Sequence, residues 1–243
     1  RLPELHPADR SQGIPLSYAQ QRMWFLEQLE PGSGYYNLPG VIKLSGPLDI
    51  NSLENSVNAL IDRHESLRTI FPSISGRAQQ KILEEVSIPL TVHDLTSVIQ
   101  EERHQILRNT INEEALRPFN LNEGPLMRLK LFRLDKEEHI LVFVIHHIVA
   151  DGWSLGIVMR EIGYFYNRFV NNQAISLAKL PIQYADFTVW QRMWLQGEIL
   201  GRQLDYWKEQ LKDSPPYLDL PFDKQRPQKQ SHKGADVSFY LST

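Results

Sequence analysis

Two histidines, an aspartate and a glycine stand close together at positions 146–152, in the segment His-His-Ile-Val-Ala-Asp-Gly. Imidazole and carboxylate groups exchange protons near neutral pH, so His146, His147 and Asp151 are candidates for acid–base chemistry. Gly152 lets backbone approach a ligand, and free N–H groups of a following helix would stabilise an oxyanion. Three kinds of site fit these residues: a catalytic histidine; structural histidines with Asp151 as a helix cap; and a metal site, less expected because no third ligand set is nearby.

The segment follows residues 140–145, the longest uninterrupted apolar run of the chain. This pattern is typical of a strand covered on both faces. Residues 127–133 alternate apolar and basic side chains, which predicts a partner strand joined to it by a turn at 135–138. Successive side chains of a strand point to opposite faces, so only one of His146 and His147 can face a cavity. A helix is expected near Trp153, and open α/β sheets bind ligands where such a strand gives way to a helix.

The rest of the pattern predicts an α/β fold in which further strands and helices follow one another along the chain. Ser17 and Gln20 have capping-box spacing and precede the apolar residues Met23, Leu26 and Leu29 of an expected helix. The other expected strands cover residues 37–44, 67–71, 80–86, 90–92 and 235–241, and the other expected helices cover 51–64, 94–114 with Asp94 as cap, 153–169, 184–195 and 199–212.

Composition excludes several classes of protein. The 243 residues include 26 basic and 29 acidic ones, a formal net charge of −3 with no basic block, so no nucleic-acid partner is expected. There is no cysteine, which excludes disulfides, thiolate catalysis and cysteine-based zinc sites. No apolar run approaches the roughly 20 residues of a membrane span, so we expect a cytoplasmic protein with no membrane partner.

Four motifs resemble one family. Residues 146–154, HHIVADGWS, closely resemble the HHxxxDG core of nonribosomal peptide synthetase condensation domains. Residues 17–26, SYAQQRMWFL, are similar to the family's SxAQxRLWxL motif. Residues 63–71, RHESLRTIF, are similar to RHExLRTxF, and residues 184–190, YADFTVW, to YxDFAxW. The match runs from about Pro15 to the C-terminus, in the family's order and spacing.

The resemblance implies a fold and a division of the chain. Condensation domains resemble two chloramphenicol-acetyltransferase-like lobes in tandem, with the active-site channel between them. This chain is similar to the first lobe, which implies an α/β fold with a mixed sheet flanked by helices. The later motif resembling GxFVNT is missing. We therefore expect a leader or interdomain linker at 1–14, the N-terminal lobe at 15–222, and the connector with the start of a missing C-terminal lobe at 223–243. The expected protein is a truncated one whose exposed inter-lobe face is apolar and favours self-association.

The resemblance also implies an activity, the formation of a peptide bond. An upstream carrier protein presents an acyl or peptidyl thioester, and the amine of a downstream carrier-bound aminoacyl thioester attacks it. The chain itself is expected to bind no cofactor, because the phosphopantetheine arms belong to the carrier proteins. Expected partners are both carriers, the missing lobe and an adjacent adenylation domain.

Site roles follow from the same resemblance. His147 is the expected catalytic residue, as general base or by positioning the amine, and Gly152 the point of backbone approach to the thioester carbonyl. His146 is expected to pack in the fold. Asp151 is expected to be structural and paired with an arginine, from the other lobe or from Arg63 or Arg68 of this chain.

Without an arginine partner, Asp151 is expected to be exposed or to have a raised pKa. Trp24, Trp190 and Trp207 are expected as core or inter-helix anchors.

Subtypes and other classes of function remain open at this point. The DGWS ending favours the joining of an L-configured donor to an L-configured acceptor. Cyclisation domains carry aspartates where this chain has His146 and His147, and epimerisation domains usually differ after the DG. A non-catalytic docking or recruitment domain would usually lack one histidine. A stand-alone acyltransferase using coenzyme A would complete its sites across the subunits of a trimer.

Overall fold

The computed structural model describes residues 2–11, 13–74, 76–218, 220–221, 223, 237 and 239. The chain forms two compact units, Arg1–Gln196 and Gly197–Thr243. This division falls inside the range 15–222 predicted for the lobe, whose boundaries remain a prediction. The expected connector at 223–233 and the expected strand at 235–241 lie almost wholly outside the described residues.

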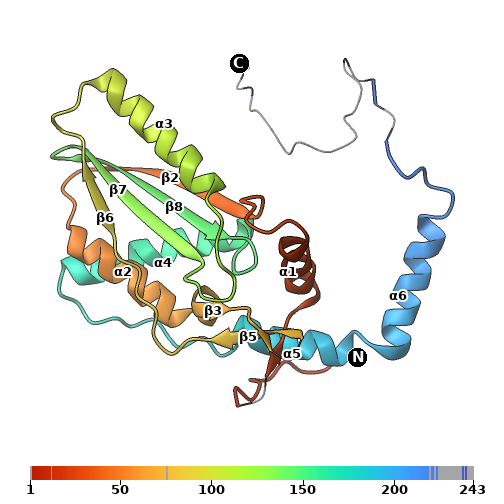
Figure 1. The fold of residues 1–243 in the computed structure, drawn as a ribbon. Coiled ribbons are helices and arrows are strands. Elements are labelled where there is room, and N and C mark those ends of the chain that lie inside the picture. Colours follow the sequence, from red (N-terminus) through yellow and green to blue (C-terminus); the bar gives the residue numbers. More distant parts are fainter. Residues whose placement is uncertain are drawn as a thin grey trace, which may run out of the picture. The chain divides into compact units, whose positions relative to one another are not determined.

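A four-stranded mixed sheet forms the centre of the first unit (Figure 1). Its strands are, in spatial order, β2 (Asn37–Ser45), β8 (Glu138–His146), β7 (Met127–Asp135) and β6 (Thr91–Asp94). β8 runs antiparallel to both of its neighbours, and β6 runs parallel to β7. The hairpin predicted from the alternation in residues 127–133 is therefore confirmed, and β8 is the inner strand that its continuous apolar run indicated.

Helices cover both faces of this sheet. α2 (Ile50–Arg63) and α4 (Gly152–Val170) pack together on one face, and α3 (Gln100–Leu116) lies on the other (Figure 1). The period of two along β8 divides its side chains between these layers. Leu141, Phe143 and Ile145 belong to the main core, whereas Val142 belongs to a small cluster against α3; Val144, near the end of the strand, also belongs to the main core.

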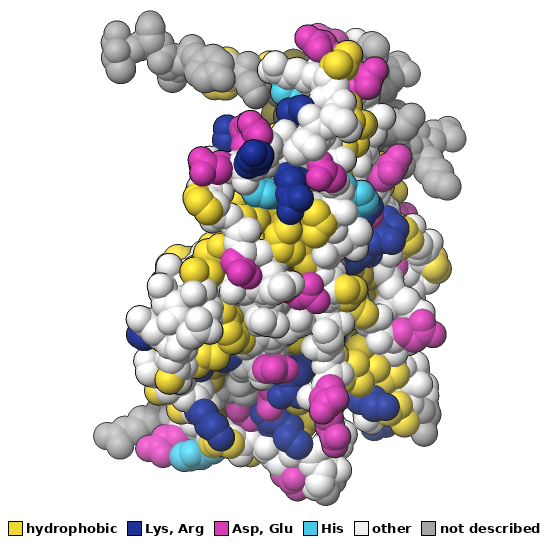
Figure 2. Space-filling model, turned by 90° about the vertical axis from the view of Figure 1, so that its left-hand side faces the viewer, with side chains coloured by type: hydrophobic (Ala, Val, Ile, Leu, Met, Phe, Trp, Pro, Cys, Tyr) yellow, Lys and Arg dark blue, Asp and Glu magenta, His cyan; other side chains and the backbone are white. Residues whose placement is uncertain are grey.

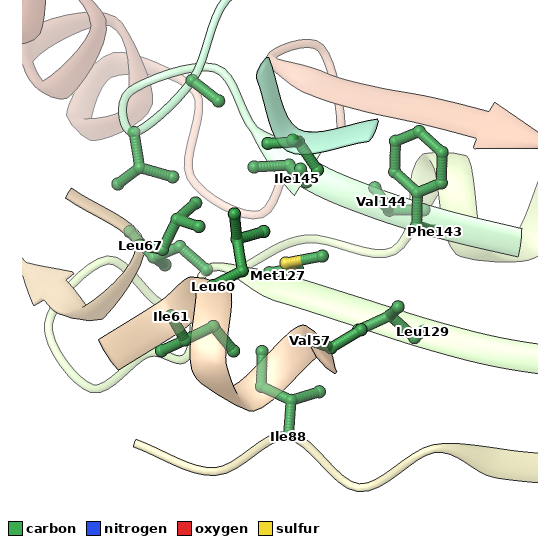
Figure 3. Close-up of a cluster of buried hydrophobic side chains, with 14 of the residues drawn as sticks. Val57, Leu60, Ile61, Leu67, Ile88, Met127, Leu129, Phe143, Val144 and Ile145 are labelled. Atoms are coloured by element: carbon green, nitrogen blue, oxygen red, sulfur yellow. The ribbon is translucent and has the colours of Figure 1, made fainter. Parts of the chain in front are cut away.

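The main core lies between α2 and the sheet. Leu60 and Ile61 are fully buried, and Figure 3 shows them with Val57 among Met127 and Leu129 of β7. Complete burial of one such aliphatic side chain contributes roughly 1.5–3 kcal/mol. This core fixes the position at which β8 ends, and hence the position of the His146–His147 pair.

A second, small sheet is built on β5 (Arg77–Ile82). β1 (Ile14–Pro15), β3 (Thr69–Ile70) and β4 (Ser73–Ile74) all pair with it antiparallel. The predicted strand at 67–71 is wrong in its first half, because Glu65–Arg68 form a 3-10 helix, η1. β1 and β4 were not predicted, since two residues are too few to show an alternation.

One of the predicted helix caps is correct and another is wrong. α1 (Tyr18–Leu29) has the predicted capping box of Ser17 and Gln20. α2 begins at Ile50, one residue before the predicted start, and Asp49 is its N-cap. Asp94 does not cap α3: it ends β6, where its carboxylate accepts hydrogen bonds from the Thr96 backbone and hydroxyl at 2.9 and 2.7 Å. A short turn closed by a neighbouring threonine competes here with the helix start.

The remaining helices are α5 (Tyr184–Trp194) and, in the second unit, α6 (Gly197–Gln210). Trp24 and Trp190 are half-buried and donate indole hydrogen bonds to Phe71 O (3.1 Å) and Pro3 O (2.7 Å), as expected of anchors. Trp207 is 58% exposed on α6, so it is not the core anchor that was one of its two predicted roles; the other role, an inter-helix anchor, stays a prediction.

The surface is mixed in charge. On the face drawn in Figure 2, basic and acidic side chains are interspersed with apolar ones. No helix in the described part of the chain is long and apolar enough to cross a membrane.

Candidate active site

The backbone leaves β8 at His146 and is held on both sides as it turns into α4. The His146 N–H donates to Leu126 O at 2.9 Å, and the His147 N–H donates to Tyr36 O at 2.7 Å. These two bonds fix the two histidines at the end of the strand, each to a different neighbouring segment.

His146 is a core residue, as predicted. Its side chain is 2% exposed, and Phe119 meets its ring edge-on at 6.0 Å between centroids. Burial, with smaller effects of His147 and Arg128, lowers the pKa of His146 to about 4. The ring is therefore neutral at pH 7, and because Nδ1 accepts the Ile148 N–H at 3.1 Å, its proton is on Nε2.

His147 faces a cavity of about 280 Å³. Its ring is half-buried, and Nδ1 is buried with no hydrogen-bond partner among the described residues. The cavity is lined by Ala19, Gln20, Met23, Ser66, His147, Ile148, Val149, Ala150, Asp151, Ser154 and Tyr184. One histidine of the pair thus packs in the core while the other reaches a cavity, as the strand periodicity predicted.

Each of the four sequence motifs contributes to this cavity. Gln20 comes from the first motif, Ser66 from the second and Tyr184 from the fourth, and they meet His147 from the third. Gln20 was predicted only as part of a helix capping box, and Ser66 and Tyr184 were given no role. Their membership of the motifs was the signal that would have identified them.

Asp151 is exposed and serves as the N-cap of α4. Its Oδ1 accepts the Ser154 N–H at 2.8 Å and the Ser154 hydroxyl at 2.6 Å. These hydrogen bonds, side chain first, hold the pKa of Asp151 below its ordinary value. Of the outcomes expected for an Asp151 without an arginine, exposure is found and a raised pKa is not.

The expectation that Arg63 or Arg68 pairs with Asp151 is wrong for the described structure. The Arg63 Nε contacts Glu161 at 3.3 Å, and Arg68 donates to Leu83 O at 2.5 Å. Both arginines line a different cavity of about 680 Å³. The end of α2 and the 3-10 helix direct their side chains toward α4 and the small sheet rather than toward residue 151.

Gly152 is the first residue of α4. A Cβ at this position would meet no atom within 4 Å. The packing of the lobe therefore does not require glycine here, and space is open beside the cavity-lining residues 151 and 154. No group of three or more His, Asp or Glu side chains in the described part of the chain is placed to hold a metal ion.

The family description "Condensation domain" matches residues 10–243. This chain belongs to the condensation-domain family. The predicted fold class, a chloramphenicol-acetyltransferase-like lobe with a mixed sheet flanked by helices, is confirmed by the observed layers and by the solved condensation domains below.

Curated relatives of the condensation domain are peptide synthetases. The chain is 45% identical over 239 residues to a linear gramicidin synthase of Brevibacillus parabrevis, covering 98% of this chain and 5% of that protein. It is 40% identical over 228 residues to phosphinothricin tripeptide synthetase PhsC of Streptomyces viridochromogenes, covering 94% of this chain and 21% of that protein. The chain thus spans a small part of the length of these relatives.

Solved structures match the condensation domain over about half of their own length. The X-domain in complex with OxyB, from teicoplanin biosynthesis, superposes with a TM-score of 0.82 and 29% identity, over 93% of this chain and 49% of that one. The starter condensation domain of rhizomide synthetase RzmA superposes with a TM-score of 0.74, over 84% and 49% of the two chains. At 20% identity the second likeness shows the fold alone.

Proposed function

We propose that this chain is the N-terminal half of a condensation domain that forms peptide bonds between two carrier-bound thioesters. The observation that carries the proposal is the convergence of all four family motifs on the cavity that His147 faces. A motif set retained only for folding would not need to place one residue of each motif around the same histidine.

In the proposed reaction the acceptor α-amine attacks the carbonyl carbon of the donor thioester. The C–N bond forms, the C–S bond breaks, the amine loses one proton and the leaving thiolate gains one. A free α-amine has a pKa near 8, so a useful fraction is neutral at pH 7 before it attacks. The nitrogen becomes strongly acidic once it adds to the carbonyl, and a base nearby then lowers the barrier.

His147 is the residue proposed for this role. Its Nδ1 is buried, so Nε2 is the nitrogen left to meet a substrate in the cavity. As a general base, His147 would contribute typically 10²–10⁴-fold in rate. As a hydrogen-bonding group that only holds the amine in line, it would contribute a few kcal/mol of positioning.

Gly152 is proposed as the point of backbone approach. The first N–H groups of α4 have no partner within the helix, and the open space at residue 152 lets a thioester oxygen come close to them. The absence of a positive φ at Gly152 supports a requirement for space rather than for backbone freedom.

The proposed partners are an upstream and a downstream carrier protein with phosphopantetheine arms, an adjacent adenylation domain and a second lobe. Support comes from the synthetase relatives and from the coverage of about half of each solved domain. Trp153, 85% exposed beside Gly152, is a large apolar side chain that a second lobe or a second copy would cover. We propose L-configured donor and acceptor, and no activity for the isolated chain.

A condensation assay with two loaded carrier proteins tests the proposal. The chain is compared with a version extended through a second lobe, each with and without His147→Ala. Dipeptide from the extended protein alone, reduced at least tenfold by His147→Ala, supports it. Dipeptide that is insensitive to His147→Ala would remove that residue's role. Carrier binding without dipeptide would favour the alternative.

That alternative is a non-catalytic recruitment domain. It is favoured by the TM-score of 0.82 to the X-domain, a protein solved in complex with OxyB. The presence of both His146 and His147 supports catalysis instead, because recruitment domains of the family usually lack one. An epimerisation domain is a further alternative, and retention of the stereocentre of a carrier-bound aminoacyl substrate would exclude it.

A further inference from the structure

The irregular segment before β1 is attached to the lobe by a buried carboxylate. Asp186 is 3% exposed, and its Oδ1 accepts the Ala8 N–H at 2.7 Å and an Arg10 Nη1–H at 2.6 Å. Its Oδ2 accepts the Gln183 N–H at 2.7 Å, which caps the first turn of α5. A segment expected to be a leader or linker thus supplies two of the donors that make this burial tolerable.

Arg10 also reaches the second motif. Its Nε and Nη2 donate to Glu65 Oε2 at 3.1 and 2.8 Å, while Nη1 holds Asp186. One guanidinium therefore joins η1 to the start of α5, with Glu65 on one side and Asp186 on the other. Gln183 makes a parallel link, accepting the Glu65 N–H at 3.1 Å.

Both joined elements contribute to the wall of the His147 cavity. Ser66 follows Glu65 directly, and Tyr184 lies two residues before Asp186; both line the cavity. The Tyr184 hydroxyl is 3.0 Å from Ser17 Oγ, which ties the same wall to the N-cap of α1. Arg10 therefore joins the element that carries Ser66 to the helix start that carries Tyr184.

We propose that Arg10 and Asp186 are positioning residues that set the width of the His147 cavity, so that the segment before residue 15 is a working part of the lobe. The proposal rests on the proposed function for its catalytic consequence and on the hydrogen bonds above for its structural one. Arg10 touches no substrate in this scheme. It acts through Glu65–Ser66 and through the first turn of α5.

Hydrogen exchange on the whole chain tests the structural part without any activity. Arg10→Gln removes the two-sided link, and we expect amide exchange of residues 65–68 and 183–187 to rise together by about tenfold. Arg108→Gln, an exposed arginine of α3 with no ion pair in the described part of the chain, is the matched control and should leave both segments unchanged. Unchanged exchange in Arg10→Gln, or a rise in one segment only, overturns the proposal.

Kinetics of the version extended through a second lobe test the catalytic part. A displaced cavity wall predicts about tenfold lower kcat/KM for Arg10→Gln, mainly through KM, with partial rescue by Arg10→Lys. Asp49→Ala, which removes the cap of α2, serves as a control for a general loss of stability. If Asp49→Ala lowers kcat/KM as much as Arg10→Gln does, the Arg10–Asp186 link only stabilises the fold, and the proposal is overturned. If the extended protein with the wild-type sequence forms no product, the proposed function fails. The exchange result alone then decides whether Arg10 and Asp186 position the cavity wall.

Discussion

The starts of two helices, α4 and α5, lie at the His147 cavity and are held in different ways. At the start of α4, Asp151 is exposed and is satisfied by Ser154, three residues away. At the start of α5, Asp186 is buried and is satisfied by Gln183 nearby and by Ala8 and Arg10, about 180 residues away in sequence. The pKa of each carboxylate is lowered. Local hydrogen bonds from Ser154 lower that of Asp151, whereas for Asp186 burial raises the pKa and the bonds from Arg10 and Ala8, far away in sequence, together with that from Gln183, outweigh it.

The difference shows which part of the site can move independently. The start of α4 needs little beyond its own turn, so it can present Gly152 and the free N–H groups to an open space. The start of α5 is tied to three other segments, so it can hold one wall of the cavity at a fixed place. The proposed reaction, which needs space for two carrier-bound substrates and a fixed geometry for attack, is compatible with one exposed side and one rigid side.

The largest expected effect is that of Asp186→Ala. Burial acts to raise the pKa of Asp186, and the bonds from Arg10, Ala8 and Gln183 outweigh it. Removing the carboxylate leaves these donors without their acceptor, so we expect the free energy of unfolding to fall by about 3–4 kcal/mol, as for a broken buried pair. Urea unfolding measures this. Asp205→Ala on α6 removes a 76% exposed partner of Lys208 and should change stability by less than about 0.5 kcal/mol.

Acid should destabilise the protein through His146, at the end of β8 before α4, at a higher pH than through Asp186 in the first turn of α5. His146, with a pKa of about 4 when folded, binds its proton more readily when unfolded, so stability falls between about pH 6.5 and pH 4. We expect a loss of roughly 2–3 kcal/mol over this range. His146→Asn, whose Oδ1 can accept the Ile148 N–H, should flatten the pH profile of urea unfolding. An equal slope in this variant would show that other groups titrate.

The stabilisation that Asp186 contributes is lost at a lower pH than this range. Its pKa is lowered in the folded state, so its stabilisation is present above about pH 4, the ordinary value of an aspartate, and is lost as the pH falls through the folded pKa. Asp186→Asn should remove this acid-sensitive part and leave the loss between pH 6.5 and 4 intact. If Asp186→Asn instead changes the loss of stability between pH 6.5 and 4, the titrations of His146 and Asp186 are coupled.

A smaller effect is expected at the exposed start of α4. Asp151→Ala removes a helix cap and should lower the free energy of unfolding by about 1 kcal/mol. Asp151→Ser keeps a capping oxygen and should recover most of the loss. A loss as large as that of Asp186→Ala would show that Asp151 has a buried partner after all.

The smallest effect on stability is expected for Gly152→Ala. Since a Cβ meets no atom within 4 Å, the free energy of unfolding should change by less than about 0.5 kcal/mol. The condensation rate of the extended protein should nevertheless fall, because the methyl group fills the space proposed for the thioester. A variant with unchanged rate would remove Gly152 from the site.

Short-range patterns in the sequence were enough to predict the central hairpin and the burial of one of the two histidines. Alternation in residues 127–133 and the apolar run at 140–145 predicted the β7–β8 hairpin, and periodicity two predicted that one of His146 and His147 is buried. The capping box of Ser17 was also correct, because both of its hydrogen bonds lie within four residues.

Which distant segments meet depends on the folded chain as a whole. The motifs gave Tyr184 and Ser66 no role until the fold placed them around His147. Arg63 and Arg68, the two partners within this chain that were considered for Asp151, contact Glu161 and Leu83 instead. Two-residue strands and the Arg10–Asp186 link leave no periodic trace in sequence. Their partners are chosen by the packing of the core and by the need to satisfy buried polar groups, and both act between residues far apart in the chain.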